Sequence, residues 1–136
     1  MKLGKLLVIA MVLVFAVIGC TNREEMLMGS WRMIDYNSTE PISPELQRDY
    51  QTNIENLKRT FALELYDDFT FERKGFGAVE RGAWFLQDDG ESLVFITQNT
   101  DQQGTVIIKE ITKRELTIQA VQGDTIVTML LEKFDL

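Results

Sequence analysis

The 136-residue sequence contains no histidine and only one cysteine, Cys20. Without an imidazole, the Ser-His-Asp and Cys-His arrangements of nucleophilic catalysis cannot form, and zinc loses its usual ligands. A single thiol cannot form an intrachain disulfide, so an oxidising compartment would add nothing to stability. These absences predict a protein that is not an enzyme and that holds no metal and no cofactor.

A basic surface is also missing. The first 19 residues hold two of the 14 basic residues and none of the acidic ones, which leaves 12 basic against 21 acidic residues and a formal charge of −9. Such a chain is repelled by phosphate backbones, and no basic stripe offsets the repulsion. Nucleic acid is therefore excluded as a partner.

The longest apolar run, residues 6–18, has 13 residues, fewer than the roughly 20 that a bilayer-spanning helix needs. Lys2 and Lys5 precede it, a pattern typical of an export signal. Val17-Ile18-Gly19-Cys20 resembles the lipobox of bacterial lipoproteins, which implies cleavage before Cys20 and acylation of that residue. A plain secretory signal with an incidental cysteine is the alternative.

The resemblance to lipoproteins predicts attachment to a lipid bilayer through acylated Cys20. An Asp directly after the cysteine would resemble an inner-membrane retention signal, but this sequence has Thr21 there. The outer membrane is therefore the expected location. Arg23-Glu24-Glu25 loosely resembles a tether that directs lipoproteins to the cell surface, and the periplasmic and surface faces both remain open. We expect a signal peptide at 1–19, a lipidated N-terminus and tether at 20–27, and one domain at 28–136.

The domain reads as strands with short connections. Gly82 to Gln98 predicts a hairpin, because two alternating β-rich runs flank Asp88-Asp89-Gly90. Seven connections join eight expected strands at 29–36, 61–65, 69–73, 79–86, 93–97, 106–109, 116–120 and 126–133. This pattern predicts an all-β fold with one helix, an eight-stranded up-and-down antiparallel β-barrel whose helix is inserted after the first strand.

The expected helix begins with Ser43 as cap and Pro44 at the first helical position, and it ends near Lys58-Arg59. It carries one narrow apolar stripe: Leu46, Tyr50, Ile54 and Leu57. We expect this helix to pack on the domain as a lid or plug, with partner binding as the alternative.

Two short segments could be mistaken for binding motifs. Gly75-Phe76-Gly77 lacks the third glycine and the strand-to-helix context of a dinucleotide loop, so it predicts a β-bulge. Asp88-Asp89-Gly90-Glu91 lacks the spacing of a calcium loop and predicts a hairpin tip.

Leu27-Met28-Gly29-Ser30-Trp31 resembles the Leu-x-Gly-x-Trp opening of lipocalins and of lipocalin-like domains in lipoproteins of the Bacteroidota. Gly82-Ala83-Trp84 is similar to their second Gly-x-Trp. Two features depart from the lipocalin pattern. No arginine beyond the last strand can stack on the first Trp, since the last one is Arg114, and the helix follows strand one rather than strand eight.

The resemblance implies a barrel with one closed end. Trp31 is expected to plug that end, with Gly29 letting the backbone pass close by, and Trp84, which follows Gly82, to point inward toward any cavity. The aromatic residues of the strands then favour a membrane-anchored lipoprotein that binds a small hydrophobic or amphipathic ligand, with Trp84, Phe71 and Phe95 as candidate contacts. The alternative is a non-enzymatic lipoprotein that binds or inhibits another envelope protein and uses the barrel as a scaffold.

Overall fold

The structure is a computed structural model that describes residues 23–100 and 102–134. The expected export signal and the acylation site Cys20 lie outside these residues.

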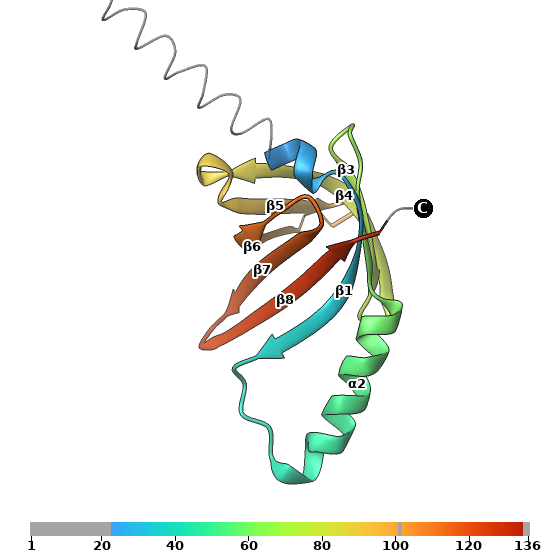
Figure 1. The fold of residues 1–136 in the computed structure, drawn as a ribbon, viewed down its shortest axis with the longest axis vertical. Coiled ribbons are helices and arrows are strands. Elements are labelled where there is room, and N and C mark those ends of the chain that lie inside the picture. The colour runs from blue at the N-terminus through green and yellow to red at the C-terminus, as the bar shows by residue number, and fades with distance from the viewer. Residues whose placement is uncertain (1–22, 101, 135–136) are drawn as a thin grey trace, which may run out of the picture.

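Eight antiparallel strands close into a barrel in which each strand pairs with the next and β8 pairs back with β1 (Figure 1). The strands are β1 (Gly29–Ser38), β2 (Ala62–Leu65), β3 (Thr70–Gly75), β4 (Ala78–Gln87), β5 (Ser92–Thr97), β6 (Gln103–Ile111), β7 (Glu115–Gln122) and β8 (Thr125–Lys133). The predicted eight-stranded up-and-down barrel is confirmed. Closure leaves no strand edge unpaired around the ring.

Tight turns set the register of the central hairpins. Phe76 and Gly77 alone connect β3 to β4, with φ of 53° and 76°, the positive values of a type I′ hairpin turn. The predicted bulge at Gly75-Phe76-Gly77 is therefore wrong, because these residues turn the chain instead of interrupting a strand. The predicted hairpin tip at Asp88-Asp89-Gly90 is confirmed: a short 3-10 turn, η2 (Asp88–Gly90), connects β4 to β5.

Helix α2 (Gln47–Thr60) lies between β1 and β2, as predicted, and follows a 3-10 turn, η1 (Pro44–Leu46). Ser43 makes no side-chain capping bond, so the regular helix starts later than the sequence indicates. Ile54 is 8% exposed against the barrel, whereas Leu46 is 57% exposed. The first half of α2 extends past the end of the barrel, as Figure 1 shows.

The opposite end of the barrel is closed by residues 23–27, a helical turn that the sequence analysis placed in the tether. Leu27 and Trp31 are both 0% exposed there. The Trp31 indole N–H donates to the Leu27 carbonyl oxygen at 2.7 Å, and the Arg23 guanidinium donates to the Gly90 carbonyl oxygen at 2.6 Å. These contacts make the segment part of the folded domain.

Lys133, at the end of β8, supplies a cation in place of the lipocalin arginine that this sequence lacks. Its ammonium nitrogen lies 4.9 Å from the centroid of the Trp31 ring and donates to the Met26 carbonyl oxygen at 2.7 Å. A cation over an indole face is attracted by the ring quadrupole. Although no arginine follows Arg114, the first Trp is thus covered by a lysine.

The buried core extends from this closed end into the interior of the barrel. Its members are Leu27, Trp31, Met33, Phe61, Leu63, Leu65, Phe71, Trp84, Leu93, Ile108, Leu116, Ile118 and Leu131. No buried side-chain nitrogen or oxygen among the described residues lacks a hydrogen-bond partner. The interior is therefore a packed core whose described polar groups are all compensated.

Trp31→Ala is expected to lower the free energy of unfolding by about 3–5 kcal/mol, because it leaves a large void beneath residues 23–27. Trp31→Phe keeps most of the ring but loses the bond to the Leu27 carbonyl, and a smaller loss is expected. Urea unfolding followed by circular dichroism measures both. An alanine variant as stable as the parent would contradict the assignment of Trp31 as the plug.

Candidate ligand-binding site

A cavity of about 470 Å³ opens at the end of the barrel opposite residues 23–27. It is bounded by the β3–β4 turn and by the residues that lead into β6 and out of β7. The floor is apolar and consists of Phe61, Leu63, Phe71, Phe95, Ile118 and Met129. The rim is polar and carries Arg73, Glu80, Gln102, Gln103 and Gln122. An apolar hollow with a few polar groups at its mouth is typical of small-molecule sites.

Two of the three predicted ligand contacts lie together on this floor. The rings of Phe71 and Phe95 meet edge to face, with centroids 4.9 Å apart and planes at 73°. Phe71 can reach this position because its backbone partner is Gly82: a Cβ there would lie 1.9 Å from the Ile96 carbonyl oxygen and 3.0 Å from the Phe71 ring. Only glycine fits where β4 passes so close to β5.

Trp84, the third predicted contact, does not line this cavity. It is buried, its indole N–H donates to the Tyr66 carbonyl oxygen at 3.2 Å, and its ring centroid lies 5.0 Å from that of Phe69. Tyr66 and Phe69 flank the β2–β3 turn, which is at the closed end. The indole points inward, as expected, but it belongs to the packed half of the barrel.

The open space in the cavity depends on Gly104, which the sequence analysis did not single out. Gly104 pairs with Phe95 across β5 and β6, and a Cβ built on it would meet no heavy atom within 4 Å. A larger side chain at this position would project into the cavity, since Phe95 on the paired strand also faces it. The missing side chain therefore keeps volume free beside the aromatic floor.

Among the described residues, the charged ones that line the cavity are Arg73 and Glu80, which form an ion pair at the rim. Both side chains are more than a third exposed, so this pair adds little stability. The Arg73 guanidinium also lies 6.0 Å from the centroid of the Phe76 ring. The described rim residues carry no net charge, so an apolar molecule can reach the floor past them without burying an unpaired charge.

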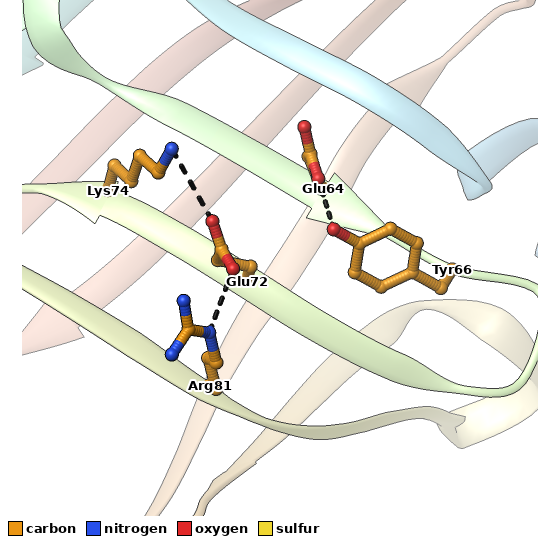
Figure 2. A network of polar contacts seen from close by, with 5 residues as sticks. All are labelled: Glu64, Tyr66, Glu72, Lys74 and Arg81. Carbon is orange, nitrogen blue, oxygen red and sulfur yellow. Dashed lines mark hydrogen bonds and ion pairs between the residues drawn. The ribbon is translucent and has the colours of Figure 1, made fainter.

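A second hollow, of about 540 Å³, lies on the outer face of β3, β4 and β5. Glu72 there accepts contacts from Arg81 Nε at 2.8 Å and Lys74 Nζ at 3.5 Å, while the Tyr66 hydroxyl donates to Glu64 (Figure 2). The bond to Arg81 lowers the pKa of Glu72, and the bond to Glu64 raises the pKa of Tyr66 to about 12. The polar groups are paired with each other, so this surface is less suited to an apolar ligand.

Within residues 23–100 and 102–134, no three acidic or cysteine side chains are grouped closely enough to hold a metal ion. In the same ranges, no helix combines the length and the apolar character needed to cross a bilayer.

No protein-family model and no curated protein matches this sequence. Solved structures do resemble it. A lipocalin-like protein from Bacteroides uniformis superposes with a TM-score of 0.52 at 12% identity, covering 80% of this chain and 99% of that chain. A DUF4847 family protein from Bacteroides vulgatus superposes with a TM-score of 0.54 at 14% identity, covering 83% and 99%. Together with the closed sheet, these likenesses define a lipocalin-like barrel.

Proposed function

We propose that this lipocalin-like protein binds a small hydrophobic or amphipathic ligand in the open half of its barrel. The observation that carries the proposal is the 470 Å³ cavity with its aromatic floor and polar rim, in a barrel whose other half is filled. A cavity of this size is within the usual range for small-molecule sites. The lipocalin-like fold supports the proposal at the level of architecture alone.

The lining residues define the chemistry of the ligand. An apolar group would displace water from Phe71, Phe95 and Ile118, which is the main source of affinity at about 25 cal/mol per Å² buried. A polar group at the other end of the ligand would reach the glutamine amides of the rim, which can both donate and accept hydrogen bonds. The acidic character of the chain disfavours polyanionic ligands.

The anchor predicted from the sequence is part of the same proposal: acylated Cys20 attaches the protein to the outer membrane, on the periplasmic or the cell-surface face. Cys20 precedes Arg23 by three residues, which span at most about 10 Å. Arg23 bonds to Gly90 at the closed end of the barrel. The mouth of the cavity then faces away from the anchoring bilayer and takes its ligand from the aqueous side.

A second candidate function, binding of another envelope protein, is favoured by exposed apolar side chains near the mouth. Phe76, Val79 and Val121 are all more than half exposed. Exposed apolar groups at a rim are typical of contact surfaces, although these three are few. The open cavity favours the small-molecule function over this one.

Gly104→Phe is expected to abolish binding of the neutral fluorescent ligand N-phenylnaphthylamine, because the new ring occupies the space beside Phe95. Ile107→Phe is the matched control, since Ile107 is on the same strand, is partly exposed and does not line the cavity. Fluorescence titration of the three proteins is the measurement. Equal affinities for parent and Gly104→Phe would rule out the barrel cavity as the site.

Cys20→Ser is expected to abolish incorporation of radiolabelled palmitate and to release the protein from the membrane fraction, because serine lacks the thiol to be acylated. Arg23→Ser serves as a control that keeps the cysteine. Labelling of the Cys20→Ser protein at the parental level would exclude this residue as the anchor.

A further inference from the structure

A third hollow, of about 360 Å³, lies between helix α2 and the barrel. Its apolar walls are Tyr36 on β1, the helix residues Tyr50, Ile54 and Leu57, and Phe76 in the β3–β4 turn. This α2 groove is formed by the helix stripe that the sequence marked as a packing face. Because the first half of α2 extends past the barrel, the stripe is only partly covered by β1 (Figure 1).

Phe76 is the wall that the α2 groove shares with the barrel cavity. On one side its ring meets Phe61 edge to face, with centroids 6.3 Å apart, and Phe61 belongs to the cavity floor. The ring is 57% exposed, and the residue has a φ of 53°, which is unusual for an aromatic side chain. This positive φ belongs to the two-residue β3–β4 turn, which holds the ring at the border of the cavity and the groove. Phe76 thus borders both hollows.

The polar groups of the α2 groove differ from those of the cavity rim. The groove is lined by the hydroxyl-bearing Tyr36, Tyr50 and Thr60 and by the amides of Asn53 and Asn56, and no charged residue of the described part of the chain lines it. Burial, with Tyr50 and Glu40 nearby, raises the pKa of Tyr36, so its phenol remains a hydrogen-bond donor at neutral pH. Such a surface recognises an uncharged group that both donates and accepts hydrogen bonds.

We propose, on the basis of the function proposed above, that the cavity and the α2 groove form one site for an elongated, single-chain amphiphile with an uncharged, hydroxyl-bearing head group. The end of the apolar chain occupies the floor at Phe71 and Phe95. The chain passes over Phe76, and the head group lies in the groove against Asn53 and Asn56. A chain too short to cross Phe76 occupies the cavity alone and gains nothing from α2.

Two glycerides of different chain length, monodecanoyl and mono-octadecanoyl glycerol, test this assignment as competitors of N-phenylnaphthylamine. In the parent protein the longer one is expected to compete about tenfold or more better, because its added methylenes are buried. Asn53→Trp fills the groove from an exposed helix position and should remove this preference without changing binding of the short glyceride. Asn56→Trp, at a second exposed groove position, should do the same.

Gln51→Trp is the matched control, because Gln51 is exposed on the same helix and does not line the groove. This variant should keep the parental preference. A preference that survives in both Asn53→Trp and Asn56→Trp, or that is lost equally in Gln51→Trp, would overturn the two-part site. Binding of N-phenylnaphthylamine that Gly104→Phe blocks would still support the cavity in that case. If the parent binds neither N-phenylnaphthylamine nor the glycerides, the proposed function itself fails.

Discussion

The structure depends on how one end of the barrel is sealed. A closed ring of eight tilted strands leaves an opening at each end. Side chains or chain segments must cover an opening if water is to be excluded from the interior there. Here Trp31 fills one end with Lys133 over its ring, and the indole N–H and the ammonium group each donate to a backbone carbonyl, of Leu27 and Met26. The packed core starts from this plug, and the barrel cavity opens at the other end.

The two ends of the barrel differ in how tightly their side chains are packed. The closed end buries large side chains, Leu27 and Trp31 among them, and burial of such apolar surface stabilises the fold. At the open end, Gly104 leaves the cavity unfilled because it has no side chain. The aromatic side chains of the floor therefore lack the van der Waals contacts that a filled core would provide. Helix α2, whose buried residue is Ile54, forms one wall of the α2 groove beside the barrel.

Local patterns in the sequence were sufficient to predict most of the fold. Alternation of apolar residues, Asp-Gly at a hairpin tip and a proline at a helix start act over a few residues, so strand number, the position of the helix and the β4–β5 hairpin could be predicted. The sequence also placed Phe71 and Phe95 on an inward face, where the structure brings them together at 4.9 Å.

Two kinds of feature could not be predicted from the sequence: the position of a side chain along the barrel axis, and contacts between segments that are far apart in the chain. Alternation shows that Trp84 points inward but not that it lies below the cavity floor. The lipocalin pattern places an arginine after the last strand to stack on the first Trp. In this structure the cation over the Trp31 ring is Lys133, which lies within β8. The role of Gly104 follows from the ring it pairs with, Phe95, which only strand register identifies.

The claim that one half of the barrel is filled and the other is a ligand site can be tested by NMR with N-phenylnaphthylamine bound. We predict intermolecular nuclear Overhauser effects from the naphthyl protons to the side chains of Met129, Ile118 and Phe95 on the cavity floor, and none to Leu27 or Leu131 at the closed end. Contacts confined to the outer face around Arg81 and Ile96, or contacts to the closed end, would contradict this account.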